Sequence, residues 1–257
     1  MKIGFVGDIH AGSHVGLWPV VDIPGEDDEF IGCRYLMECW RHLIASWPEL
    51  DLLVLMGDLI DGKQQKSSGC GVFDGDLGTQ AEKAAEVLKP LAQKAKKIMR
   101  VWGTPYHESH DKILKIVDLT LGVALTKQVI DLEIDGQVLN VAHHPMGGGT
   151  LYRGTSLDRE ALWSQLAAHA RSVPDARWIV RAHRHYYALQ DGRQRTILAM
   201  PCWQLATAHA VKSSYWRFQP DLGAVLMVDD KSHYSGYRFI DYAYPNPTVE
   251  VTRWPAL

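Results

Sequence analysis

The stretch KIGFVGDIH, residues 2–10, carries the pattern that decides the fold. Its first five residues form a short run rich in apolar, β-branched and aromatic side chains, which is typical of a buried strand. The run ends at Gly7-Asp8-Ile9-His10. In a strand that continues to His10, residues i and i+2 face the same side, so Asp8 and His10 would converge on one ion.

The same arrangement, an apolar run followed by Asp or His, recurs three more times. Residues 51–56 precede Gly57-Asp58-Leu59-Ile60-Asp61, residues 138–142 precede His143-His144, and residues 178–182 precede His183-Arg184-His185. Open α/β sheets bind ligands at the carboxyl ends of their strands, where these motifs would lie. Imidazole and carboxylate ligands without a thiolate suit Mn, Fe, Zn or Ni. Each motif alone is common, but their combination predicts a metal site.

Amphipathic segments alternate with these runs and predict helices over residues 30–44, 79–97 and 157–170, with Pro90 expected to kink the second. Further strands are expected at residues 97–102, 224–228 and 237–242. Asp135-Gly136 suits a type I′ turn between strands at 129–134 and 137–142, and a second hairpin is expected at Asp191-Gly192. The sequence therefore predicts an α/β protein with a mixed sheet or two packed sheets, in one domain over residues 1–257.

The composition is that of an ordinary globular protein, with 46% hydrophobic residues, 22% charged residues and a formal net charge of −3. These values exclude a disordered chain, and no apolar run approaches the roughly 18 residues of a membrane span. Because the first residues lack a signal-peptide core and the four cysteines form no C-x-x-C pair, we expect a cytoplasmic protein with reduced thiols and no membrane partner. The unusual count is that of histidine, with 12 residues.

Taken together, the strand-end motifs resemble those of the calcineurin-like metallophosphoesterase family, which run Asp-x-His, Gly-Asp-x-x-Asp, Gly-Asn-His-Asp/Glu, a His block, and Gly-His-x-His. The resemblance covers residues 1 to about 190, in the same order. It implies a four-layer α/β/β/α sandwich with two mixed β-sheets. In this chain the blocks are Asp8-Ile9-His10, Gly57-Asp58-Leu59-Ile60-Asp61, Gly103-Thr104-Pro105-Tyr106-His107-Glu108, His143-His144 and Ala182-His183-Arg184-His185.

Carried over residue by residue, the resemblance implies a site for two divalent metal ions, with Mn expected first and Fe, Zn or Ni as alternatives. One metal would take Asp8, His10, Asp58 and His185, and the other would take Asp58, His143 and His183, so that Asp58 bridges them. His143 is preferred to His144 because His-His-Pro resembles the family's His-x-Pro form, in which the first histidine is the ligand.

The third block departs from the family pattern, because the Asn ligand is missing and two extra residues separate Gly103 from His107. His107 precedes an acid and an expected helix, so it most resembles the family's catalytic histidine, here the general acid. Two alternatives stay open: His107 is itself a metal ligand, or Thr104 or a water takes the place of the Asn. Asp61 and Glu108 are expected to orient histidines, with a turn cap equally open for Asp61.

The substrate prediction rests on residues 181–217, which hold six basic residues, one acidic residue and several aromatic ones. Basic groups follow phosphates and aromatic rings stack on unpaired bases, so Arg184, Trp203 and Tyr215 are candidate substrate-binding residues. An equally simple reading treats these aromatics as half-buried strand residues. The sequence favours hydrolysis of a phosphodiester in single-stranded nucleic acid or a nucleotide. A phosphomonoesterase and a non-catalytic phosphate-binding module are the alternatives, and nothing in the sequence indicates the oligomeric state.

Overall fold

Two mixed β-sheets form the centre of the computed structural model, which describes residues 1–19, 21, 30–108, 111–144, 152–207 and 219–247. The first sheet has six strands in the order β11-β10-β1-β2-β3-β4, in which β1 to β4 run parallel and β10 and β11 add antiparallel neighbours. Its strands are β1 (Lys2–Val6), β2 (Leu52–Leu55), β3 (Ile98–Val101), β4 (Leu125–Lys127), β10 (Leu222–Asp229) and β11 (Tyr237–Tyr244).

The second sheet has five strands in the order β5-β6-β7-β9-β8. Strands β6, β7 and β9 are parallel to one another, and the hairpin strands β5 and β8 are antiparallel to their neighbours at the two edges. The strands are β5 (Val129–Ile134), β6 (Gln137–Ala142), β7 (Ala176–Arg181), β8 (Ala188–Asp191) and β9 (Thr196–Ala199).

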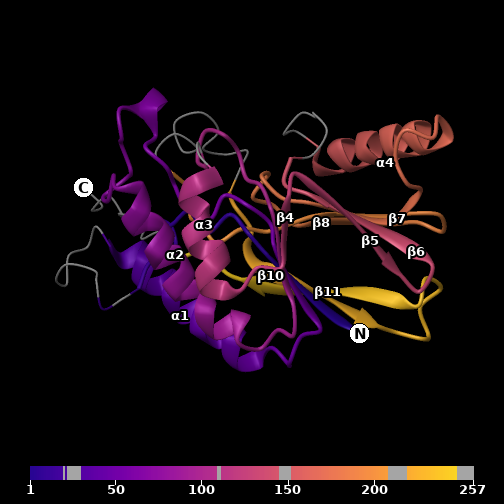
Figure 1. Cartoon of the computed structure of the whole chain (residues 1–257), viewed down its shortest axis with the longest axis horizontal. Coiled ribbons are helices and arrows are strands. Elements are labelled where there is room, and N and C mark those ends of the chain that lie inside the picture. Colours follow the sequence, from indigo (N-terminus) through magenta and orange to yellow (C-terminus); the bar gives the residue numbers. More distant parts are fainter. Residues whose placement is uncertain (20, 22–29, 109–110, 145–151, 208–218, 248–257) are drawn as a thin grey trace, which may run out of the picture.

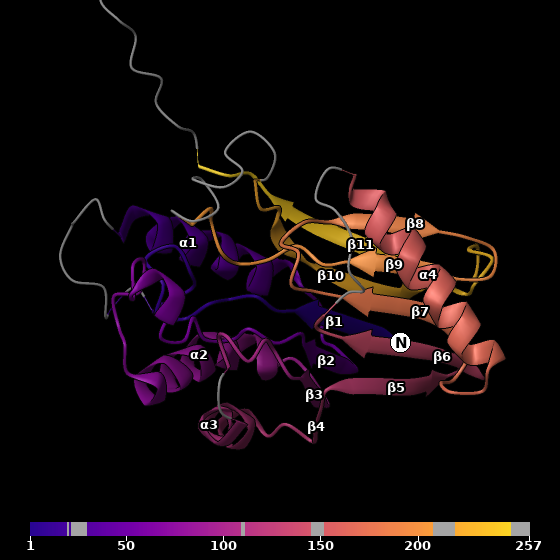
Figure 2. The ribbon, with the colours of Figure 1, turned by 90° about the horizontal axis from the view of Figure 1, so that it is seen from above.

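Helices cover the outer face of each sheet, which gives four layers (Figure 1). Three helices, α1 (Ile31–Ser46), α2 (Leu77–Ala92) and α3 (Asp111–Leu121), pack on the first sheet, and α4 (Arg153–His169) packs on the second. Figure 2 shows α4 running obliquely across the strands of the second sheet. Among the described helices, none combines the length and the apolar character needed to cross a membrane.

A larger part of the core lies between the first sheet and its helices, and a second part lies where the two sheets face each other. Phe5 and Val54 from the first sheet pack there with Trp178 and Leu198 from the second, and all four are essentially buried. Each such side chain stabilises the fold by about 1.5–3 kcal/mol through removal of apolar surface from water. The observed layers confirm the predicted α/β sandwich with two mixed sheets.

The predicted elements agree with the structure apart from some boundaries. Asp135 and Gly136, with φ of 49° and 76°, join β5 to β6 as the type I′ prediction requires, and the second predicted hairpin is β8–β9. The second helix was expected to reach residue 97, but α2 ends at Ala92, two residues after Pro90. Pro90 lies within the last turn, where it has no N–H to donate to the carbonyl four residues earlier, and Gln93 N still donates to Lys89 O beyond it.

One buried amide, Gln80 on α2, anchors the long loop between β2 and α2. Its Oε1 accepts from Gly62 N at 2.9 Å, and its Nε2 donates to the carbonyl oxygens of Gly62 and Asp74. Both ends of the loop are thereby tied to one side chain. A buried peptide group that loses its partner costs about 1–3 kcal/mol.

We therefore expect Gln80→Leu, which keeps the size and removes the polar atoms, to lower the free energy of unfolding by about 2–4 kcal/mol. Urea denaturation measures the change, with Gln165→Leu on the exposed face of α4 as the matched control. A loss below about 0.5 kcal/mol, the range of an ordinary surface substitution, would show that this amide does not anchor the loop.

Candidate metal centre

The predicted ligands lie in the loops that follow the strands, and most of them adopt a left-handed backbone conformation. The expectation that the first strand continues to His10 is wrong, because β1 ends at Val6. The two loops instead pair with each other, with Asp8 N donating to Gly57 O and His10 N to Asp58 O. Non-glycine residues with such φ values are strained and gather at functional sites. The ligand candidates with positive φ are Asp8 (50°), His10 (47°), Asp58 (48°), His183 (69°) and His185 (54°).

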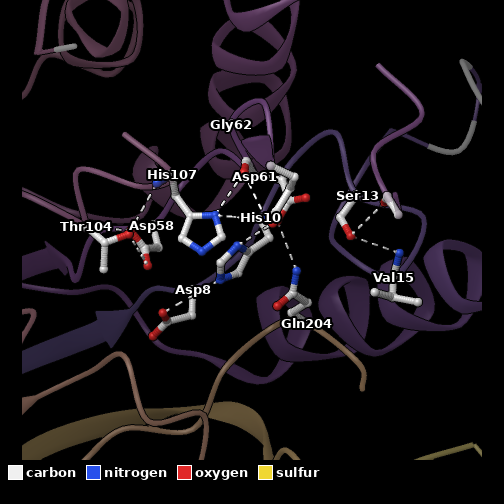
Figure 3. Close-up of polar contacts among 12 residues, drawn as sticks. Asp8, His10, Ser13, Val15, Asp58, Asp61, Gly62, Thr104, His107 and Gln204 are labelled. Atoms are coloured by element: carbon white, nitrogen blue, oxygen red, sulfur yellow. Dashed lines mark hydrogen bonds and ion pairs between the residues drawn. The ribbon is translucent and has the colours of Figure 1, made fainter. Parts of the chain in front are cut away.

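One group of three side chains forms around the buried carboxylate of Asp8. Its Oδ1 lies 3.2 Å from His185 Nε2 and 3.8 Å from His10 Nε2, and the two imidazole nitrogens are 3.3 Å apart. His10 Nδ1 lies 3.0 Å from Asp61 Oδ1, which holds the ring with its Nε2 towards Asp8 (Figure 3). These three side chains can hold a cation.

A second group forms around Asp58. Its Oδ2 lies 3.1 Å from His143 Nε2 and 4.0 Å from His183 Nδ1. His143 donates its Nδ1 proton to Met56 O at 2.6 Å, which leaves Nε2 as the free nitrogen. The two groups meet where His143 Nε2 comes within 4.0 Å of Asp8 Oδ1. His143 therefore belongs to the cluster, whereas the side chain of His144 is exposed.

The unsatisfied atoms of this cluster fit a bound cation. Asp8 Oδ1 and His143 Nε2 are buried, and neither has a hydrogen-bond partner among the described residues. A buried polar atom without a partner is costly, so a ligand is expected to satisfy it. Two carboxylates and several imidazoles, without a thiolate, form a donor set suited to borderline divalent metals.

Opposite charges dominate the titration of the cluster. Burial alone would lower the pKa of both His10 and His143. The carboxylates of Asp61 and Asp8 instead raise the pKa of His10 to about 9. Those of Asp58 and Asp8 raise the pKa of His143 to about 9. Burial alone would raise the pKa of Asp8, yet the neighbouring imidazoles hold it well below its usual range. Both carboxyl groups of the cluster are therefore ionised and able to bind a cation, because the pKa of Asp58 is also depressed.

The altered third block places Thr104 and His107 at different parts of the cluster. Thr104 donates its backbone N–H to Asp58 Oδ1 at 2.6 Å, and its hydroxyl lies 3.2 Å from Asp58 Oδ2. His107 instead groups with His10 and Asp61, and Asp61 O accepts its Nδ1 proton at 2.8 Å. Since a carbonyl oxygen only accepts, His107 Nε2 is the nitrogen left to exchange a proton. Burial first, and then the charge of His10, lower the pKa of His107.

The two predicted orienting acids differ in their contacts. Asp61 Oδ1 lies against His10 Nδ1 and 3.6 Å from His107 Nδ1, as expected of a group that orients histidines. Glu108 contacts no histidine among the described hydrogen bonds, so that expectation is wrong. The carboxylate of Glu108 instead accepts from the backbone N–H groups of Leu59 and Gly103, at 2.8 and 2.7 Å, and so connects the loop after β2 with the loop after β3.

Two glutamines that the sequence did not reveal also contact Asp61. Gln64 Nε2 lies 3.1 Å and Gln204 Nε2 3.2 Å from Asp61 Oδ1. Gln64 comes from the loop between β2 and α2, whereas Gln204 follows β9 without any recognisable motif. With His10, they give one carboxylate oxygen three donors and fix its position.

The structure changes the predicted substrate-binding set. Trp203 is wholly buried and packs against Trp40 with ring centroids 5.0 Å apart, so its indole cannot stack on a base. Its backbone N–H donates to Asp8 O, which places it beneath the site rather than at the surface. Arg184 is half-buried and lies in the chain between the candidate ligands His183 and His185, and Tyr215 lies outside the described residues.

Comparison with known proteins agrees with this geometry. The family model of the calcineurin-like phosphoesterases matches residues 1–187, and the chain belongs to this family. It is therefore placed among the metallophosphoesterases, hydrolases of phosphoester bonds that use divalent metals. No curated protein shows a significant match to the chain.

Solved structures with a similar fold are distant in sequence. An archaeal phosphodiesterase is 10% identical with a TM-score of 0.45, over 94% of this chain and 100% of that one. YfcE, a phosphoesterase from E. coli, is 17% identical with a TM-score of 0.46, over 89% and 92%. Vps29 from Entamoeba histolytica, complexed with zinc, is 12% identical with a TM-score of 0.48, over 95% and 99%.

Proposed function

We propose that this chain is a phosphodiesterase with two divalent metal ions, Mn first among the candidates, that acts on nucleic acid or a nucleotide. The observation that carries the proposal is the meeting of two ligand groups at the unsatisfied pair Asp8 Oδ1 and His143 Nε2. Asp8, His10 and His185 would hold one cation, His143 and His183 the other, and Asp58 would bridge the two. Two such ions clamp a phosphate, lower the pKa of water and stabilise charge on the oxygens of the displacement.

The other residues of the site position and protonate the substrate. His107 supplies a proton to the departing alkoxide from its imidazolium form and through Nε2, since its Nδ1 proton is committed to Asp61 O. Asp61 keeps His10 in the orientation that leaves Nε2 for a cation. Thr104, hydrogen-bonded to Asp58, occupies the place where the family pattern has Asn and fixes the carboxylate of that ligand.

The preference for a diester over a monoester comes from the basic and aromatic composition of residues 181–217. Arg184, between the proposed ligands His183 and His185, offers one positive charge to a phosphate oxygen of either kind of ester. The test is the rate on bis(p-nitrophenyl) phosphate against p-nitrophenyl phosphate, with Mn²⁺ added. A faster diester reaction supports the proposal, a faster monoester reaction favours a phosphomonoesterase, and no reaction with either favours a phosphate-binding module.

We also propose that residues 1–257 act as one catalytic unit in the cytoplasm. Strands β10 and β11 lie beyond the residues that match the family, yet β10 pairs with β1 inside the first sheet. The segment after β9 likewise reaches the site through Gln204 and Trp203. The cytoplasmic location stays a prediction from composition.

A further inference from the structure

A half-buried tyrosine stands beside the proposed general acid and has no role in the chemistry described so far. Tyr106 is one of the two residues that lengthen the third block. Its ring packs edge-on against His107, with centroids 5.0 Å apart and an interplanar angle of 87°. From the loop between β2 and α2, the exposed Lys66 places its Nζ 5.5 Å from the centre of the same ring.

The position of His107 says which part of a substrate would lie there. A general acid has to be within hydrogen-bond reach of the oxygen that it protonates, so the leaving group of the diester lies next to His107. Tyr106 contacts the same imidazole, and Gln64 Nε2 approaches it to 3.3 Å from the loop side. The walls around the departing alcohol are thus the aromatic ring of Tyr106 and the loop segment that carries Lys66.

The magnitudes favour a base on this ring. An exposed lysine over an aromatic face strengthens binding about 2- to 5-fold. A nucleic-acid base stacked on an aromatic side chain strengthens binding about 5- to 150-fold. A base therefore displaces the ammonium group of Lys66 from the ring face, and the freed charge can pair with an anionic group on the same leaving group.

We propose that Tyr106 and Lys66 form a subsite for the leaving group. The enzyme then releases a nucleoside in preference to a small alcohol from the same diester. Lys66 adds a preference for a nucleoside that carries a further phosphate. The inference rests on the proposed phosphodiesterase activity and specifies the side of the diester that the enzyme recognises.

The leaving-group subsite is tested with one diester that can release either of two alcohols. Hydrolysis of the methyl ester of thymidine 5′-phosphate adds water across one of two P–O bonds. The phosphorus takes the hydroxide and the departing oxygen takes the proton, which gives either thymidine with methyl phosphate or thymidine 5′-phosphate with methanol. We expect the wild type to release mainly thymidine. Tyr106→Ala should lower the thymidine-to-methanol ratio about 10-fold, the equivalent of a stacking energy within the usual range, and Tyr106→Phe should preserve it.

The ratio separates recognition from a merely structural role, because a displaced His107 slows both reactions alike and leaves the partition unchanged. An unchanged ratio in Tyr106→Ala, or a wild type that releases mainly methanol, would overturn the subsite while phosphodiesterase activity stands. Absence of both reactions in the wild type would instead reject the proposed function on which the subsite rests.

Lys66 has a separate readout. With a second phosphate on the 3′-hydroxyl of the thymidine, the wild-type ratio of nucleoside release to methanol release should rise. In Lys66→Ala the ratio for this substrate should be about 3-fold lower than in the wild type, the size of effect that an exposed charge pair has. Lys66→Arg should retain it. An equal rise in wild type and Lys66→Ala would remove Lys66 from the subsite.

Discussion

Asp58→Asn is expected to reduce diester hydrolysis about 1,000-fold or more, with protein stability retained. Asp58 Oδ2 lies 3.1 Å from His143 Nε2, and Oδ1 accepts the N–H of Thr104. The substitution keeps the shape but removes the negative charge shared by the two proposed cations. A loss of several kcal/mol in charge stabilisation corresponds to a rate loss of that order. The measurement is kcat/KM on bis(p-nitrophenyl) phosphate with saturating Mn²⁺.

The matched control for this substitution is Asp175→Asn, since Asp175 is an exposed carboxylate paired with Arg195 before the start of β7, whereas the candidate ligands follow the end of that strand. Its activity should equal that of the wild type. A residual rate in Asp58→Asn within about 10-fold of the wild type would contradict the bridging position of Asp58, because loss of a ligand to both cations should slow the reaction far more than that.

His107→Ala is expected to have an effect that depends on the leaving group. In its imidazolium form His107 donates the Nε2 proton, because Asp61 O holds the Nδ1 proton. An alkoxide needs that proton in order to depart, so the loss on a dinucleotide or another alkyl diester should be about 100-fold or more. A nitrophenolate is a stable anion that needs little protonation, so the loss on bis(p-nitrophenyl) phosphate should be far smaller. Paired kcat values on the two substrates measure the difference.

A histidine outside the cluster supplies the comparison. His169, exposed at the end of α4, can be changed to Ala without an expected effect on either substrate. If His107→Ala slows both diesters by the same factor, His107 serves as a metal ligand or a positioning group and not as the acid. That outcome would restore the alternative that the altered third block left open.

The fold and the gathering of the candidate ligands could be predicted from the sequence because both follow from local patterns. Short apolar runs define the strands, and the residue after each run defines where the polar side chains emerge. Asp135-Gly136 determines a hairpin through its positive φ values alone. The same local reasoning brought Asp8 and His10 together, although by the wrong geometry. They converge through left-handed loop residues beyond the strand and not through the pleat of the strand itself.

The remaining features depend on contacts between distant segments, which a single sequence does not display. Trp203 has the composition of a stacking residue, yet it is buried against Trp40 and contacts Tyr244 of β11. Glu108 follows His107 in the chain but satisfies backbone groups of another loop. Gln204 reaches Asp61 across 143 residues of sequence. Periodicity and motif spacing carry no information on such pairings.

The number of bound ions decides whether two divalent cations share Asp58. Metal-free protein can be titrated with Mn²⁺ while free Mn²⁺ is followed by electron paramagnetic resonance and diester hydrolysis is measured on the same samples. We expect two ions per chain, hydrolysis that appears only as the second ion binds, and loss of at least one ion in Asp58→Asn. Full hydrolysis with one ion or none bound would show that the chain does not use a shared metal pair.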